Sequence, residues 1–116
     1  MENKDNPYDK AYELARAITD SDVYLDYIAA KERIEKHPEY KEKIYNLRNR
    51  QMELNKLKLL GEEMAGDSVN EITLEFAKLN QINEIAEFFN AEGCFIQLFN
   101  DLQEIIHKAV AENLSE

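Results

Sequence analysis

The chain has 116 residues, of which 44% are hydrophobic and 33% charged, and its net charge is −10. This length suits a single domain over residues 1–116, and the acidity argues against passive attraction to nucleic acid or to an anionic membrane. With three glycines and two prolines, the composition favours long helices over short strands joined by turns. We therefore expect an all-α fold, a helical hairpin or bundle of about five helices with a long C-terminal helix.

The first two helices are predicted from their start and stop signals. Residues 1–6 are expected to be a flexible N-terminus. A helix then begins at Pro7, because Asn6 can cap it and proline suits the first helical position, and it runs to about Thr19. The acidic and hydroxyl residues 20–22 predict the start of a second helix. It ends near His37, because the residue before a proline disfavours the α conformation.

The third helix begins at Pro38, and its main apolar stripe can be followed to Met64. A thinner line recurs every seven residues on another side, which predicts a second packing neighbour; it consists of Tyr45, Met52 and Leu59. Residues 61–67 contain two glycines and three acidic residues and are predicted to be the loop between helices. Ser68 and Glu71 then have the spacing of a capping box, which predicts a fourth helix that ends near Leu79.

The fifth helix, residues 82–114, is long and has an apolar stripe wider than one neighbour needs. We expect it to pack antiparallel to the third helix and also to join subunits in a homodimer or higher homo-oligomer. The predicted subunit interface consists of Phe88, Phe89, Phe95, Ile96, Phe99, Leu102 and Ile106. Polar Glu92, Gln103 and Asn113 fall on the heptad seam of this helix, where they either set the register between subunits or lie solvated at the edge of the stripe.

Candidate chemistry is sparse. Glu104 and His107 have the E-x-x-H spacing of di-iron bundles, but such sites need a second pair and two more glutamates, so a metalloenzyme is the least favoured alternative. The lone Cys94 is predicted to pack as a small apolar residue, and Gly93 to mark either a close helix approach or a kink. We expect no catalytic residue, no metal and no cofactor.

Basic residues are concentrated in the middle of the chain. Residues 31–58 hold nine of the fourteen lysines and arginines against five glutamates, a net charge of +4. The simpler interpretation is pairing with neighbouring glutamates; the alternative is a surface for an acidic partner or RNA, formed by Arg48, Arg50, Lys56 and Lys58. No apolar run reaches the roughly 18 residues of a membrane span, the first residues show no signal-peptide pattern, and one cysteine cannot form an internal disulfide. A reducing, cytoplasmic location is therefore expected.

The order of the helical motifs resembles the YlbF/YmcA (Com_YlbF) family over most of residues 8–110. The segments that carry the resemblance are residues 8–14, 21–24, 30–31, 37–38, 48–54, 89–92 and 99–106. The resemblance implies a small, self-associating cytoplasmic bacterial protein. Some members act without catalysis in complexes that influence competence, sporulation and biofilm development and assist an RNA-cleaving enzyme. The iron–sulfur ligation of the complex-forming members is not implied, because Cys94 is the only cysteine.

The leading hypothesis is therefore a non-catalytic regulatory protein that self-associates through its last helix and binds another, unidentified protein. The alternative is an RNA-binding accessory protein that uses the basic residues of the third helix.

Overall fold

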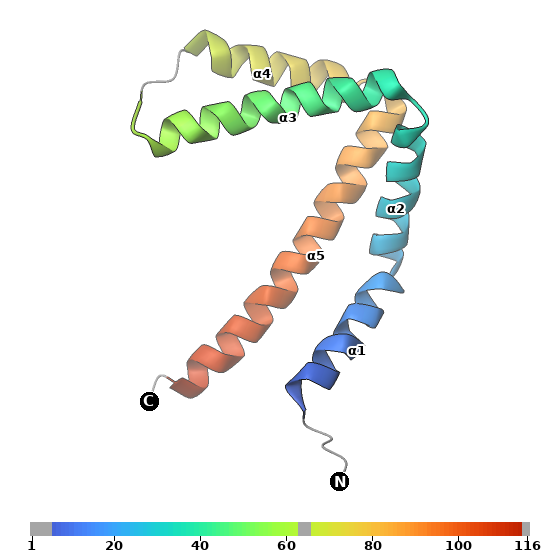
Figure 1. The fold of residues 1–116 in the computed structure, drawn as a ribbon, viewed down its shortest axis with the longest axis vertical. Helices are drawn as coiled ribbons and strands as arrows, with labels where there is room; N and C mark the ends of the chain where they lie inside the picture. Colours follow the sequence, from blue (N-terminus) through green and yellow to red (C-terminus); the bar gives the residue numbers. More distant parts are fainter. Residues whose placement is uncertain (1–5, 63–65, 115–116) are drawn as a thin grey trace. The chain divides into compact units, whose positions relative to one another are not determined.

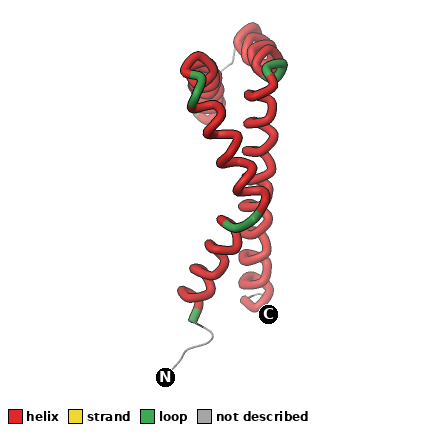
Figure 2. Tube along the Cα trace, turned by 90° about the vertical axis from the view of Figure 1, so that its right-hand side faces the viewer, coloured by secondary structure: helices red, strands yellow, loops and turns green. Residues whose placement is uncertain are grey.

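A computed structural model describes residues 6–62 and 66–114 of the chain, and this part folds into helices joined by short turns without any strand (Figures 1 and 2). The five helices are α1 (Pro7–Thr19), α2 (Asp22–Glu35), α3 (Pro38–Leu59), α4 (Gly66–Leu79) and α5 (Asn83–Leu114). The predicted all-α fold with a long last helix is confirmed. The predicted flexible N-terminus lies outside the described residues except for Asn6.

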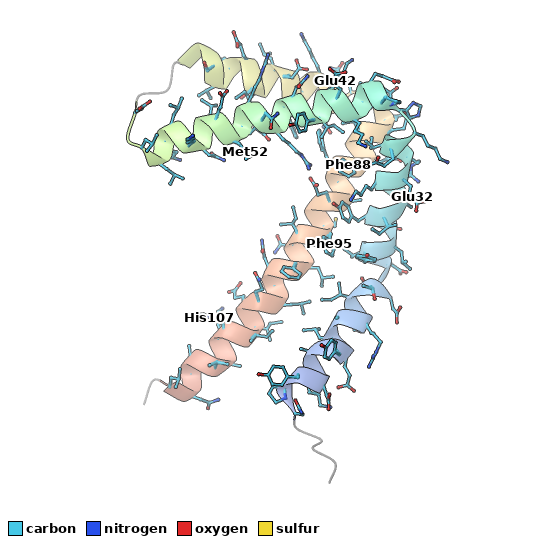
Figure 3. All side chains as sticks on the ribbon, in the orientation of Figure 1. Glu32, Glu42, Met52, Phe88, Phe95 and His107 are labelled. Atoms are coloured by element: carbon cyan, nitrogen blue, oxygen red, sulfur yellow. The ribbon has the colours of Figure 1, made fainter. Side chains whose placement is uncertain are left out.

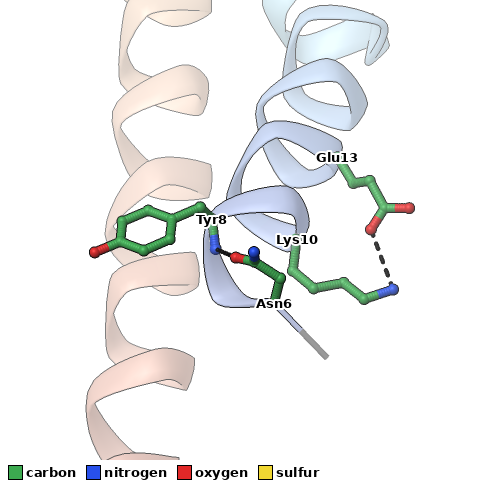
Figure 4. Close-up of polar contacts among 4 residues, drawn as sticks. All are labelled: Asn6, Tyr8, Lys10 and Glu13. Atoms are coloured by element: carbon green, nitrogen blue, oxygen red, sulfur yellow. Dashed lines mark hydrogen bonds and ion pairs between the residues drawn. The ribbon is translucent and has the colours of Figure 1, made fainter. Parts of the chain in front are cut away.

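The helix starts follow from local hydrogen bonds. The Asn6 side chain accepts a hydrogen bond from the backbone N–H of Tyr8 at 2.8 Å, so Asn6 is the predicted N-cap of α1 (Figure 4). Lys10 and Glu13 form an ion pair at 3.2 Å on the same helix (Figure 4). The Ser21 hydroxyl oxygen accepts a hydrogen bond from the N–H of Tyr24 at 3.2 Å, which caps α2 in the same way.

Helix α3 ends in a C-terminal cap formed by a glycine. Gly61 has a φ of +73°, a conformation that glycine adopts without steric cost. The N–H of Gly61 donates to the carbonyl of Lys58 at 3.1 Å, and that of Glu62 donates to the carbonyl of Leu57 at 3.0 Å. These two bonds form a Schellman motif, so α3 ends at Leu59 rather than continuing toward Met64, which lies outside the described residues.

The start of α4 differs from the prediction. The helix begins at Gly66, two residues before the predicted cap, so Ser68 and Glu71 both lie inside the helix and the capping box is wrong. Of the predicted loop over residues 61–67, residues 66 and 67 belong to α4, and residues 63–65 lie outside the described residues. The motif failed because serine and glutamate three residues apart also occur within the first turns of a helix, where the spacing alone does not define the terminus.

The chain divides into two compact units, and α2 and α5 contribute residues to both. One unit comprises Met1–Ala29 with Ala91–Glu116, and the other comprises Ala30–Asn90. The assignment of residues 1–116 to one domain stays a prediction.

Within the unit Ala30–Asn90, α3 and α4 lie side by side as a helical hairpin (Figure 1). Within this unit α4 is the helix that pairs with α3, since a short connection makes helices that follow one another in the sequence neighbours in space. Of α5, only residues 83–90 belong to this unit, so the expectation that α5 packs along α3 stays a prediction for the rest of that helix. The buried hydrophobic residues of the described chain all belong to this unit; they are Ala30, Ile34, Ile44, Leu47, Leu79, Ile85 and Phe88.

Three contacts tie α5 to the other helices of this unit. The Arg48 guanidinium lies 5.5 Å from the centre of the Phe88 ring, a cation–π geometry. The ring of Phe76 stacks on that of Phe89 with centres 5.2 Å apart. Arg33 and Glu87 form an ion pair at 3.1 Å, which is about half exposed and contributes at most about 1 kcal/mol. Ring and aliphatic packing, rather than charge, therefore holds this unit.

The unit that contains α1 is held by half-buried aromatic rings. Tyr27 stacks on Phe95 with ring centres 5.2 Å apart and planes 5° from parallel, and Tyr24 meets Phe95 edge-on at 5.8 Å. The described residues of this unit include no buried side chain.

The distribution of burial predicts where α5 is sensitive to truncation. Ile85 has no exposed surface, so Ile85→Ala should lower the free energy of unfolding by about 2–5 kcal/mol. Ile105 is 63% exposed on the same helix, and Ile105→Ala should change that free energy by less than about 0.5 kcal/mol. Urea denaturation followed by circular dichroism measures both. Equal losses for the two variants would contradict the core assigned here.

Candidate functional site

An exposed apolar seam runs along the second half of α5. Its side chains are 45–55% exposed and recur at the alternating three- and four-residue spacing of a coiled coil; they are Ile96, Phe99, Ile106 and Val110. Gln103 occupies the position between Phe99 and Ile106. At about 1.5 Å per residue this α5 seam is about 21 Å long. Val110 is one residue that the predicted interface set missed, although the heptad spacing identifies it.

The predicted interface residues divide into two groups. Phe88, Phe89 and Phe95 pack against Arg48, Phe76 and Tyr27 in the contacts described above, and Leu102 is half-buried. Figure 3 labels Phe88 and Phe95 at successive levels of α5. Ile96, Phe99 and Ile106 remain exposed. The wide stripe thus serves the chain's own fold on one side and leaves the α5 seam uncovered on the other.

The positions next to the α5 seam carry no carboxylate, lysine or arginine. In the heptad that places Ile96 and Phe99 at the apolar positions, the flanking residues are Phe95, Leu102 and Ala109 on one side and Asn100, His107 and Leu114 on the other. Opposite the seam, Gln97 donates to Asp101 at 2.8 Å and Lys108 pairs with Glu104 at 2.9 Å. Two copies of this surface can therefore approach without repulsion between carboxylates.

The polar residues of the seam differ in their surroundings. The Asn113 side-chain amide donates to the carbonyl of Ala109 at 3.1 Å within its own helix. Gln103 is exposed, and Glu92 is half-buried. Gln103 is thus the polar residue that lies between exposed apolar members of the seam.

A second exposed apolar line lies on α3. Tyr45, Met52 and Leu59 are 64%, 67% and 87% exposed, and we call this line the α3 ridge. Figure 3 shows the labelled Met52 on the side of α3 away from α4. The residues predicted to contact a second neighbour are therefore mostly exposed in the described structure.

The four basic candidates of α3 do not gather on one face. Successive helical residues are rotated by about 100°, which places Arg48, Arg50, Lys56 and Lys58 around most of the circumference. Arg50 and Lys56 line a groove of about 540 Å³ between α3 and α4 together with Glu53 and Glu71. The predicted basic surface is therefore interleaved with acidic side chains.

The titratable groups of the described chain form no metal site. Glu104 of the E-x-x-H pair is occupied by Lys108, and no group of three or more histidine, cysteine, aspartate or glutamate side chains is close enough to hold an ion within the described residues. A hydrogen bond from Lys41 lowers the pKa of Glu35. Desolvation and then the negative charge of Glu84 raise the pKa of Tyr40, so this hydroxyl stays protonated at neutral pH.

The glycine and cysteine in the middle of α5 do not pack inside the chain. A Cβ atom added to Gly93 would meet nothing within 4 Å, so a close helix approach within the described chain is excluded there. Cys94 is exposed, so the prediction that it packs as a small apolar residue is wrong within the described chain. None of the described helices is long and apolar enough to span a membrane.

The sequence matches a known family along most of its length. The model of the family described as control of competence regulator ComK, YlbF/YmcA, matches residues 8–111. The chain belongs to this family. The description links the Com_YlbF family to the control of a competence regulator and names no reaction.

The relatives similar in sequence are uncharacterised bacterial proteins. A UPF0342 protein of Caldicellulosiruptor saccharolyticus is 31% identical over 105 residues, which cover 90% of this chain and 88% of the relative. A UPF0342 protein of Symbiobacterium thermophilum is 33% identical over 107 residues, covering 92% and 96% of the two chains. A solved protein of unknown function (DUF964) from Bacillus stearothermophilus has the same fold, with a TM-score of 0.81, 19% identity and coverage of 94% and 96%.

Because the space beside Gly93 is open, alanine at this position is predicted to stabilise the fold. Gly93→Ala should raise the free energy of unfolding by up to about 1 kcal/mol, because alanine loses less backbone entropy in a helix and meets no neighbour. Gly61→Ala is the matched control, and it should lower the stability because Gly61 has a φ of +73°. Thermal unfolding monitored at 222 nm compares the three proteins. A loss of stability in Gly93→Ala would show that the side of α5 at residue 93 is occupied.

Proposed function

We propose that this chain is a non-catalytic regulatory protein that acts as a homo-oligomer joined by the α5 seam. The observation that carries the proposal is the exposed run of Ile96, Phe99, Ile106 and Val110 at coiled-coil spacing. Exposed apolar surface that recurs at this spacing gains free energy when a second helix covers it, at about 25 cal/mol per Å² of apolar area removed from water.

The neighbours of the seam support pairing between identical surfaces. In a two-fold dimer the same patch faces itself, so a patch whose charges all have one sign would bring like charges together. The flanking positions have no carboxylate, lysine or arginine, while the carboxylates of Asp101 and Glu104 lie on the opposite side of α5. Gln103 can hydrogen-bond across such an interface and so help to set the register.

The unit that contains the α5 seam also has little internal support. Its described residues include no buried side chain, and α1 exposes Tyr8 and Tyr12 by 76% and 69%. A second copy would provide this unit with the apolar contacts that it lacks within one chain. Tyrosine is favoured at protein interfaces because its ring can be buried while its hydroxyl stays near water.

The family supports a regulatory role. Its description names the control of a competence regulator, and the motifs of this chain resemble members that influence competence, sporulation and biofilm development through RNA processing. We place the chain in such a role as an adaptor that binds a protein partner.

Direct RNA binding through α3 is the alternative. It has less support, because the four basic candidates lie around most of the circumference of α3 rather than on one face. Phosphate binding by lysine and arginine weakens steeply with salt, so this alternative requires binding at low salt that depends on Arg50, Lys56 and Lys58.

The mass in solution tests the proposal. The native chain should elute in size-exclusion chromatography with light scattering at a multiple of its 13.6 kDa, and Phe99→Glu should shift it toward 13.6 kDa because a carboxylate would be buried in the interface. The matched control is Leu74→Glu, which alters a side chain 62% exposed on α4. A native chain of 13.6 kDa at micromolar concentration, or equal masses for the native chain and Phe99→Glu, would refute self-association through this seam.

A further inference from the structure

The α3 ridge is a second contact surface, separate from the α5 seam. Tyr45, Met52 and Leu59 lie seven residues apart, so they follow one line along α3 for about 21 Å. Each is more than 60% exposed, and all three belong to the unit Ala30–Asn90. The core of α3 faces another way, through Ile44 and Leu47, so the ridge is not the edge of the packed stripe.

The charges beside the ridge all have one sign. At about 100° per residue, Lys41, Arg48 and Lys56 lie within about 60° of the ridge, whereas Glu42 and Glu53 lie about 80–100° away from it. Asn49 and Asn55 are the neutral polar residues in the same band. This strip is part of the basic stretch of residues 31–58, in a chain that is acidic as a whole.

Two of these cations are held in place by neighbours. The Lys41 ammonium lies 2.7 Å from the Glu35 carboxylate, and the Arg48 guanidinium lies over the Phe88 ring. Glu35 neutralises part of the charge at the Lys41 end. A side chain already restrained by such contacts loses less conformational entropy when a partner binds.

We propose that the α3 ridge docks an acidic amphipathic helix of a partner protein. Leucine-like side chains of that helix would lie against Tyr45, Met52 and Leu59, and its carboxylates would face Arg48 and Lys56. Seven-residue spacing matches a helix, which presents apolar side chains at the same interval. Charge complementarity would speed association and select against basic partners.

The other occupants fit less well. A second copy of α3 would bring like charges together along the ridge. The α5 seam of a second copy has uncharged flanks and offers these cations no carboxylate except Glu92. Single-stranded RNA binds several stacked aromatic rings, and the ridge has one, Tyr45.

The test uses two fluorescein-labelled 21-residue peptides with leucine at the apolar heptad positions. One has glutamate at the flanking positions and the other has lysine there. Fluorescence anisotropy with the full chain should give a Kd at least about tenfold lower for the acidic peptide. Met52→Glu should raise that Kd at least about tenfold and Lys56→Glu about threefold, while Phe99→Glu should leave it unchanged.

Each other outcome overturns the proposal. If the acidic peptide does not bind, or if both peptides bind equally, an acidic helix is excluded as the partner of the ridge. Loss of binding in Phe99→Glu but not in Met52→Glu moves the site to the α5 seam. A labelled 20-nucleotide single-stranded RNA serves as the second probe. If it binds more tightly than the acidic peptide and Met52→Glu weakens its binding, the ridge is a nucleic-acid site. A change of mass in Met52→Glu alone assigns it to contact between copies. The proposal is independent of self-association, because Phe99→Glu keeps the ridge whether or not it separates the subunits.

Discussion

The structure depends on a limited amount of buried apolar surface that is confined to one part of the chain. All buried side chains of the described residues lie between Ala30 and Phe88, where α3 and α4 pair and the first turns of α5 join them. A helix in water gains most of its stability from packing its apolar face rather than from intrinsic propensity. The second half of α5 has such a face without a core to receive it. This imbalance makes contact with another chain the natural completion of the fold.

The two exposed apolar surfaces, the α5 seam and the α3 ridge, differ in character. The α5 seam is apolar with uncharged flanks, which suits contact between identical copies. The α3 ridge is narrower and has Arg48 and Lys56 beside it, which suits an acidic partner of a different kind. In the adaptor role proposed above, the α5 seam would build the assembly and the α3 ridge would recruit a partner. The Com_YlbF family, described by its control of a competence regulator, is consistent with a protein that works through contacts.

Much of the fold was predictable from local chemistry. Asn6 and Pro7 identified the start of α1, Pro38 the start of α3, and the apolar period of α5 its length, because caps, proline and periodicity act through near neighbours. A helical hairpin or bundle was expected, but with the long α5 rather than α4 as the main partner of α3, since an amphipathic stripe indicates that a helix packs but not against which helix. The beginning of α4 at Gly66 was missed because its motif also fits the inside of a helix.

The candidate sites were predictable in part for the same reason. The width of the α5 stripe indicated two functions, yet the sequence could not divide its residues between them. Phe95 meets Tyr27 and Phe88 meets Arg48 only because α2 and α3 bring those partners into place. The basic residues of α3 looked like one surface in the sequence, and helical geometry separates them. Contacts between distant segments decide these assignments, and no local pattern encodes them.

Site-directed cross-linking tests most directly whether a second copy covers the α5 seam. In a Cys94→Ser background, single cysteines at Ile96, Phe99, Gln103, Ile106 and Val110 would be oxidised and compared with cysteines at Gln97 and Glu104 on the opposite side of the helix. The account predicts a covalent dimer for at least one seam position and none for Gln97 or Glu104. If the two helices are antiparallel, the position that cross-links is the one nearest the two-fold axis. Dimers that form only at Gln97 or Glu104, or at no seam position, would contradict it.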